Sequence, residues 1–390
     1  MASQSFRRAV TKARRALRLV EGGEPEAAAI VLEKLAANRD GRHFGRHWLQ
    51  LQACCLKRGD FRAISEPFRM LRFIGPQGLF ILIGPYTTRR GGGASMQLSG
   101  MVGRVLPHAA LPELTGHLEA LFGMVAGPLP RVLPVRRYAS IGTLAGEAGE
   151  AFVVPNEWGW PDSADGPALN DMREQRRRFQ AAGRECIRRI FTEPGASLLL
   201  NAIEGEDAGI EVQQREYAMH DIGHASGIGL RRKLADGLLS TFWMRSVEEW
   251  RADGVAFELA ARTGSQEAAG KLVAANLCVR LGIDAQRGGG IERDTDVNVS
   301  LLTFDRLLKA GAIRIVGRRL AFEESTWAGL ARAVEVMRTD AVHLTREELR
   351  CEHLLGLHRL YGGLEVQPAT LELFRGLVVD VCSGVYRELA

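Results

Sequence analysis

Apolar residues recur three and four positions apart along most of the chain, a spacing that places them on one face of a helix. The helical pattern covers residues 5–72, 111–125, 171–188, 211–224, 247–261, 265–283 and 326–390. Residues 313–322 follow another pattern, because apolar and polar residues alternate on both sides of Gly317, and this indicates a β-hairpin. The sequence therefore predicts a mainly α protein with a small β component.

Differences in composition divide the chain into three regions. Residues 1–72 form a helical N-terminal region, and residues 73–170 form a Gly/Pro-rich lobe in which α and β signals are mixed. Residues 171–390 return to the helical pattern and include the predicted hairpin. A chain of 390 residues is long enough for two or three domains, or for one large domain with two lobes.

Composition and charge argue against several classes of protein. Hydrophobic residues make up 46% of the chain and charged residues 25%, as in ordinary globular proteins, and no segment has the length of an apolar membrane span. The net charge of +5 comes without a basic stripe interleaved with aromatic residues, so we do not expect nucleic-acid binding. The N-terminus lacks an apolar signal core, and the six cysteines form no CxxC pair. We expect a cytoplasmic protein with free thiols and no membrane contact, whose helical N-terminus could bind a protein partner.

The strongest candidate for chemistry is a pair of histidines, His220 and His224, in the segment HDIGH. Residues four apart on a helix lie one turn above each other on the same face, so two imidazoles can converge on one metal ion. A catalytic zinc takes three nitrogen or oxygen ligands from the protein and keeps one position open. Glu249 could supply the third ligand, and Asp253, four residues further along the same predicted helix, could orient a ligating imidazole.

These residues also have ordinary structural interpretations. Ser246 and Glu249 have the spacing of a capping box, in which Ser246 caps a helix and Glu249 bonds back to its N–H group. The two histidines could equally be core residues with satisfied hydrogen bonds. A second HxxxH pair, His43 and His47, is expected to consist of surface or packing histidines.

Together the two segments resemble the dipeptidyl peptidase III family of zinc metallopeptidases. Residues 222–227, IGHASG, are similar to the end of that family's histidine–glutamate motif, and residues 248–253, EEWRAD, are similar to its Glu-Glu-Cys-Arg-Ala-Glu/Asp segment. The likeness extends over about residues 150–365, although only these two segments are specific. It implies a two-lobed metallopeptidase-like fold with a zinc site in a central cleft.

The resemblance also implies roles for individual residues. Asp221 stands where the family has its general-base glutamate, and Tyr217 could stabilise an oxyanion near the metal, unless it is a core aromatic residue. The implied Zn²⁺ ligands are His220, His224 and Glu249. The two carboxylates that would orient these ligands are Glu248 and Asp253.

This sequence departs from the family in two ways. The family usually places its histidines five residues apart, whereas His220 and His224 are four apart, as in the wider HExxH group. The carboxylate of Asp221 is one methylene shorter than that of a glutamate, which draws it away from the water that it must deprotonate. Peptidase activity could therefore be weak, redirected or lost.

We therefore expect a zinc-dependent hydrolase in which metal-activated water attacks an amide or peptide bond of a short peptide or an amide-like small molecule. Fe²⁺ or Mn²⁺ would also suit a His/His/Glu ligand set. One alternative is a non-proteolytic metalloenzyme, either biosynthetic or an HD-type phosphohydrolase. HD sites also use a His-Asp pair, but they need an upstream histidine, and the nearest here are His117 and His108. The other alternative is a catalytically inactive peptidase-like scaffold that binds a partner.

Overall fold

The computed structural model describes most of the chain, and its helices outnumber its strands. The described residues are 4–90, 93–106, 114–123, 131–142, 167–171, 176–177, 179–228, 233, 237–286, 293–351 and 354–389. The predicted class, mainly α with a small β component, is confirmed. None of the described helices combines the length and the apolar character that a membrane crossing requires.

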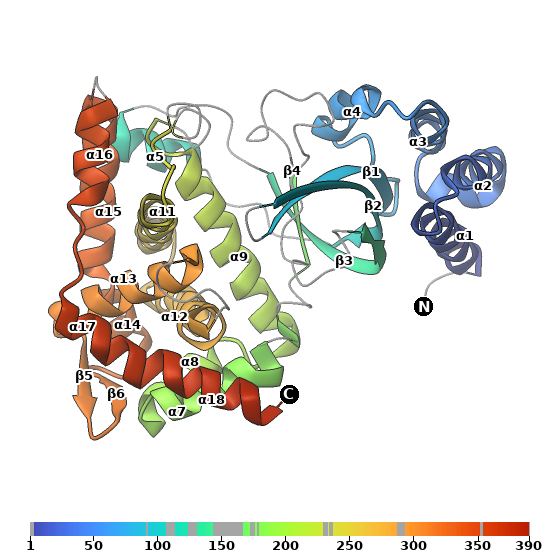
Figure 1. Cartoon of the computed structure of the whole chain (residues 1–390). Coiled ribbons are helices and arrows are strands. Elements are labelled where there is room, and N and C mark those ends of the chain that lie inside the picture. The colour runs from blue at the N-terminus through green and yellow to red at the C-terminus, as the bar shows by residue number, and fades with distance from the viewer. Residues whose placement is uncertain are drawn as a thin grey trace. The chain divides into compact units, whose positions relative to one another are not determined.

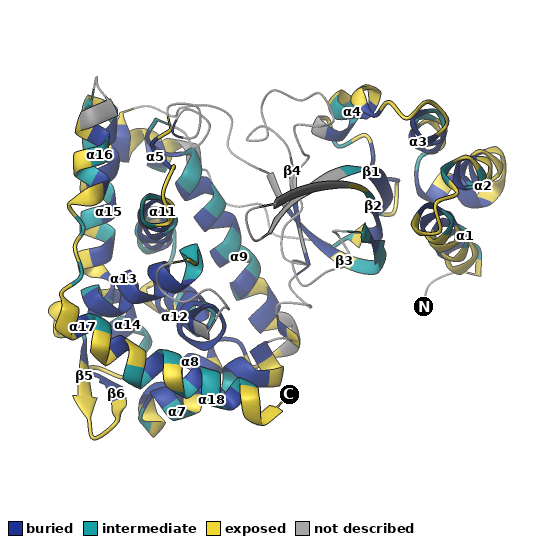
Figure 2. Ribbon diagram, in the orientation of Figure 1, coloured by how far each residue is buried: buried dark blue, intermediate teal, exposed yellow. Residues whose placement is uncertain are grey.

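The chain forms two compact units, and it passes between them more than once (Figure 1). The first unit contains Met1–Ala109 and Pro130–Gln175, and the second contains Ala110–Leu129 and Arg176–Ala390. Residues 143–166 of the predicted Gly/Pro-rich lobe lie outside the described residues. Each unit has its own cluster of buried apolar side chains. Figure 2 colours the buried residues of both units, apolar and polar, dark blue.

The first unit combines helices with a four-stranded sheet. Its helical elements are α1 (Gln4–Glu21), α2 (Pro25–Ala37), η1 (Arg39–His43), α3 (Arg46–Arg58), η2 (Arg62–Ile64) and α4 (Ser65–Arg69). Its strands are β1 (Leu79–Arg90), β2 (Gly93–Val105), β3 (Arg131–Ile141) and β4 (Pro167–Asn170), in the order β1-β2-β3-β4. Neighbouring strands are antiparallel, except that β3 and β4 are parallel.

Helix α3 protects the edge of this sheet. Strand β1 lies at the edge and therefore has backbone groups without a partner strand. The indole Nε1–H of Trp48 donates to the carbonyl of Ile81 over 2.6 Å, and the amide of Ile83 donates to Oε1 of Gln52 over 2.7 Å. Two buried side chains of α3 thus provide hydrogen-bond partners for backbone groups of β1 that lose their contact with water on folding.

The second unit is almost entirely helical. Its helices are α5 (Leu114–Phe122), α7 (Arg184–Ile190), α8 (Glu193–Asn201), α9 (Glu206–Ala225), α11 (Phe242–Thr263), α12 (Gln266–Gly282), α13 (Thr295–Lys309), α14 (Trp327–Ala333), α15 (Glu335–Arg350), α16 (Leu354–Gly362), α17 (Pro368–Phe374) and α18 (Asp380–Leu389). Short helical turns cover Phe179–Gly183, Asp284–Gln286 and Arg375–Val379. Strands β5 (Ile313–Val316) and β6 (Arg319–Phe322) form an antiparallel hairpin at the residues where alternation predicts one.

Most residues of helix α11 are buried, and the helix packs against α9, α12, α13 and α15 (Figures 1 and 2). The contact with α9 depends on Gly223. A Cβ atom at this position would lie 2.5 Å from the carbonyl oxygen of Ala252 and 2.8 Å from its Cα. The absence of a side chain therefore lets the two helix backbones touch, and this brings the residues of α9 close to those of α11.

The capping-box interpretation of Ser246 and Glu249 is wrong. Helix α11 begins at Phe242, well before these residues, and its N-cap is Thr241, whose Oγ1 accepts from the amide of Met244 over 3.2 Å. Ser246 lies inside the helix, where its hydroxyl donates to the carbonyl of Phe242 over 2.7 Å. Glu249 is consequently more than one turn inside the helix, and its carboxylate has no capping role.

Candidate metal centre

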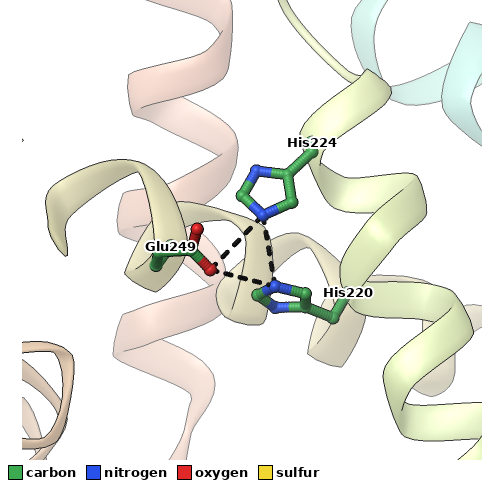
Figure 3. Close-up of side chains that lie close together, drawn as sticks. All are labelled: His220, His224 and Glu249. Carbon is green, nitrogen blue, oxygen red and sulfur yellow. Dashed lines mark hydrogen bonds and ion pairs between the residues drawn. The ribbon is translucent and has the colours of Figure 1, made fainter. Parts of the chain in front are cut away.

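Two helices bring three ligand-type side chains to one point (Figure 3). His220 and His224 lie one turn apart on α9, and Glu249 projects from α11. The two Nε2 atoms are 3.1 Å apart, and Oε2 of Glu249 lies 3.1 Å from Nε2 of His220 and 3.4 Å from Nε2 of His224. Among the described residues, these three form the group of histidine, cysteine and acidic side chains that could hold a metal ion.

Two buried carboxylates orient the imidazoles from behind. Nδ1 of His220 donates to Oδ1 of Asp253 over 2.7 Å, and Nδ1 of His224 donates to Oε1 of Glu248 over 3.0 Å. This hydrogen-bond network assigns the proton of each neutral ring to Nδ1. Both Nε2 atoms then direct lone pairs toward the carboxylate of Glu249, and such an arrangement is stable only when a cation or a proton lies between them.

The spacing of the three ligand atoms fits a zinc ion. Zinc binds histidine nitrogen and carboxylate oxygen at about 2.0–2.2 Å in tetrahedral geometry, which places two ligand atoms about 3.3–3.5 Å apart. The observed separations are 3.1, 3.1 and 3.4 Å, so one lies in this range and two lie slightly below it. The Glu249 side chain keeps 32% of its exposure, so the group can be reached from outside, whereas Glu248 and Asp253 are buried behind it.

The same contacts shift the pKa values of the group. Burial alone would lower the pKa of His220, but the hydrogen bonds to Asp253 and Glu249 raise it well above the usual histidine range. Burial alone would raise the pKa of Glu249, but His224 and His220 lower it well below the usual range. Without a metal, the group thus attracts protons to its histidines and keeps its carboxylate charged, which is the electrostatic character of a cation site.

Asp221 lies beside this group but does not belong to it. The side chain is half-buried on α9, and burial raises its pKa, while the nearby imidazoles of His220 and His224 act in the opposite direction. Tyr217 is also half-buried, with its ring centroid 6.2 Å from that of His220. Their predicted roles as general base and oxyanion donor stay predictions.

The remaining candidate histidines do not converge on the metal centre. His43 ends the short helix η1 and is buried, with Nδ1 3.0 Å from Oε1 of Gln77, whereas His47 is exposed on α3. The second HxxxH pair therefore spans two elements and forms no common face, in agreement with its predicted packing and surface positions. His117 lies on α5, outside the group that could hold a metal, and His108 lies outside the described residues.

Sequence reasoning missed the residues that hold the orienting carboxylates in place. Asp253 accepts from Nε of Arg280 over 2.9 Å, and Arg280 also donates to Asp284 over 3.0 Å. Glu248 accepts from Lys233 over 2.5 Å. Arg280 and Lys233 belong to other segments than their partners and carry no motif of their own, so only the packing of the helices brings them to the site.

Comparisons with known proteins agree with this fold. A model of a family of unknown function, DUF6014, matches residues 19–218. The solved structure of DPP III from Caldithrix abyssi has a TM-score of 0.68 and 15% identity, and the alignment covers 95% of this chain and 72% of that one. Dipeptidyl-peptidase III from Corallococcus sp. strain EGB has a TM-score of 0.59 and 14% identity, covering 94% of this chain and 70% of that one. A search of curated proteins finds no match. The DPP III-like fold expected from the two sequence segments is thus confirmed.

Proposed function

We propose that this chain, which belongs to the DUF6014 family of unknown function, is a zinc-dependent hydrolase that cleaves an amide or peptide bond. One observation carries the proposal: two Nε2 lone pairs and a carboxylate oxygen converge within 3.4 Å, while buried carboxylates hold both Nδ1 protons on the far side. The folds that resemble this one belong to enzymes named dipeptidyl peptidases. Short peptides and amide-like small molecules are therefore the substrate class that we propose.

Each residue of the centre has a distinct task in this proposal. His220, His224 and Glu249 would hold the zinc ion, which would supply Lewis acidity and make a water molecule easier to deprotonate. Asp221 accepts the proton from the attacking water. Its raised pKa makes it a stronger base than an exposed aspartate, although its short side chain limits its reach. Tyr217 is the candidate hydrogen-bond donor to the developing oxyanion.

Metal analysis tests the ligand set directly. We expect about one zinc per chain in protein purified without chelator, and none in Glu249→Ala. Glu267→Ala is the matched control, because Glu267 is an exposed glutamate of the same unit that pairs with Lys271 on the surface of α12. Equal metal content in Glu249→Ala and wild type, or no metal in either, would overturn the proposal. Iron or manganese in place of zinc would favour a non-proteolytic metalloenzyme.

The aspartate at position 221 favours a second candidate, a peptidase-like protein without peptidase activity. Asp221→Glu separates the two, because the added methylene restores the usual reach of a general base. If peptide hydrolysis in Asp221→Glu rises at least about tenfold above wild type at equal zinc content, the chain is a peptidase with a weakened base. If wild-type activity on an amide falls in the variant, Asp221 is suited to different chemistry.

A further inference from the structure

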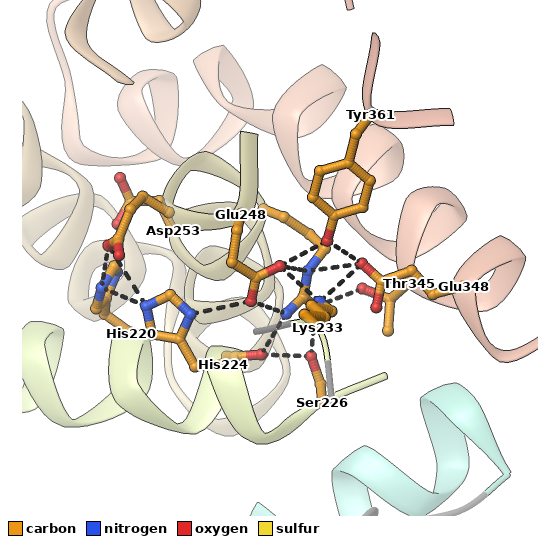
Figure 4. Close-up of polar contacts among 12 residues, drawn as sticks. His220, His224, Ser226, Lys233, Glu248, Asp253, Thr345, Glu348 and Tyr361 are labelled. Carbon is orange, nitrogen blue, oxygen red and sulfur yellow. Dashed lines mark hydrogen bonds and ion pairs between the residues drawn. The ribbon is translucent and has the colours of Figure 1, made fainter. Parts of the chain in front are cut away.

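The carboxylate of Glu248 is held by four donors that belong to different parts of the second unit (Figure 4). Nζ of Lys233 lies 2.5 Å from it, and the hydroxyl of Tyr361 lies 2.6 Å from it. The third donor side chain, Arg251, contacts both of its oxygens, with Nη2 at 2.7 Å and Nε at 3.0 Å. The fourth donor is Nδ1 of His224. A carboxylate has about four lone-pair positions, so Glu248 is held from every direction.

A second buried carboxylate, that of Glu348 on α15, shares three of these donors. Nζ of Lys233 donates to it over 2.9 Å, Nε of Arg251 lies 3.3 Å away, and Tyr361 forms a very short contact with it. This cluster consists of two cations, two anions and one phenol, all of them almost fully buried: Lys233, Arg251, Glu248, Glu348 and Tyr361. Because an unbalanced charge is costly at such depth, the neutrality of this cluster is a condition of its stability.

Arg251 connects the cluster to the end of α9. Its Nη1 donates to the hydroxyls of Ser226, over 2.7 Å, and Thr345, over 2.8 Å, and its Nη2 lies 3.1 Å from the carbonyl of Gly223. The cluster therefore links the helix that carries both histidines to α11, α15 and α16 (Figure 4).

We propose that Lys233, Glu348 and Tyr361 are positioning residues for the metal centre, acting on His224 through Glu248. The inference rests on the proposed function in one respect, since it takes His224 to be a ligand. Lys233 holds Glu248 against the Nδ1–H of His224, and Glu348 balances the charge that Lys233 introduces. The affinity of the centre for zinc consequently depends on residues from two C-terminal helices and from the segment between α9 and α11.

The charges of Lys233 and Glu348 balance each other, so a second substitution should offset the effect of the first. A merely structural role of these residues would not produce such a recovery. In Lys233→Met, two buried carboxylates share the single cation Arg251, and their repulsion displaces Glu248 from His224. In Lys233→Met/Glu348→Gln, one cation and one anion are gone, so that Glu248 and Arg251 remain as a neutral pair. The second substitution should therefore restore what the first one loses.

The measurement is the zinc dissociation constant, obtained by competition with a chromophoric chelator. We expect Lys233→Met to bind zinc about 10–100-fold more weakly than wild type, as is typical when a partner of a metal ligand is removed. The double variant should recover to within about threefold of wild type. Lys271→Met, which removes an exposed lysine of α12, is the control and should match wild type.

Unchanged affinity in Lys233→Met, or a double variant that binds no better than the single one, would overturn the inference while the zinc site stands. Failure of the wild type to bind zinc would overturn the proposed function, and the inference with it. If Lys233→Met does not fold, Tyr361→Phe takes its place, because it removes one donor without changing the charge. Its affinity should fall about three- to tenfold, the value of one hydrogen bond, and an unchanged affinity would again contradict the inference.

Discussion

Glu216 is a buried acid one helical turn before His220, and its charge state depends on its surroundings. Only 7% of the residue is exposed, and Nδ2 of Asn276 donates to its Oε1 over 2.9 Å. Burial disfavours the charged carboxylate, and repulsion from Asp253 adds to this effect, so the pKa of Glu216 rises to about 7. The folded protein therefore binds a proton here over a pH range in which the unfolded chain has lost it.

Glu216→Gln should stabilise the metal-free protein above neutral pH. Because the pKa rises from 4.5 to about 7 on folding, the cost of burying Glu216 is absent below pH 4.5 and grows until about pH 7. Above that pH the cost is on the order of 3 kcal/mol, and glutamine avoids it while still accepting from Asn276. The free energy of unfolding, measured in urea at pH 5 and pH 8, should differ between variant and wild type by about 1 kcal/mol or less at pH 5 and by on the order of 3 kcal/mol at pH 8. An equal difference at both pH values would contradict the shifted pKa.

At this scale the sequence predicts residues that are close along the chain and misses those that are distant. His220, His224, Glu249 and Asp253 were identified from helical spacing and resemblance, and the structure brings all four together. Nothing along the chain relates position 348 to position 224. The link between them runs through helix packing, so only the three-dimensional structure can reveal it.

Among the elements, the contact between α9 and α11 determines the geometry of the centre, because each helix supplies part of the ligand set. Gly223 lies between the two histidines in the sequence and touches the backbone at Ala252. A side chain at this position would meet backbone rather than a flexible neighbour, so the helices themselves would have to separate.

Gly223→Ala should therefore weaken both stability and metal binding. Separating two packed helices to admit a methyl group typically costs about 1–3 kcal/mol, despite the better helix propensity of alanine. Thermal unfolding and zinc content would measure the two effects. Gly116→Ala on α5 is a suitable control, because a Cβ atom there would meet nothing within 4 Å, and it should be neutral or slightly stabilising. A fully stable, zinc-binding Gly223→Ala would show that the close approach is not required.

Elements whose apolar residues recur at a regular spacing could be predicted from the sequence. Elements that depend on contacts with distant residues could not. Alternation predicts the hairpin of β5 and β6, whereas the long hairpin formed by β1 and β2 lies in the Gly/Pro-rich region, where the sequence shows only mixed α and β signals. Much of that hairpin consists of glycine, threonine and polar residues. Its edge is stabilised by Trp48 and Gln52 of α3, which are distant in sequence.

For the whole molecule, the separation of the apolar residues into two clusters predicts how stability responds to the metal. All three proposed ligands belong to the second unit, whose core is distinct from that of the first among the described residues. A ligand stabilises only the structure that binds it.

Removal of zinc should consequently affect one unfolding transition and not the other. In scanning calorimetry, a strong chelator should lower the melting temperature of the second unit by several degrees, since about 1 kcal/mol corresponds to about 2–4 °C for a unit of this size. The transition of the first unit should not move. Equal shifts of both transitions, or no shift in either, would contradict this assignment of the metal.

The path of the chain determines how this protein can be divided into fragments. Helix α5 belongs to the second unit, although residues of the first unit precede and follow it in the sequence. Its Leu114, Leu118 and Leu121 are part of the apolar cluster of the second unit, and Arg346 donates to the carbonyl of Leu121 over 3.1 Å. A fragment that begins at Arg176 would thus keep every proposed ligand but expose the apolar surface against which α5 packs. We expect such a fragment to aggregate. Adding residues 110–129 as a separate peptide, or grafting them through a linker, should restore solubility.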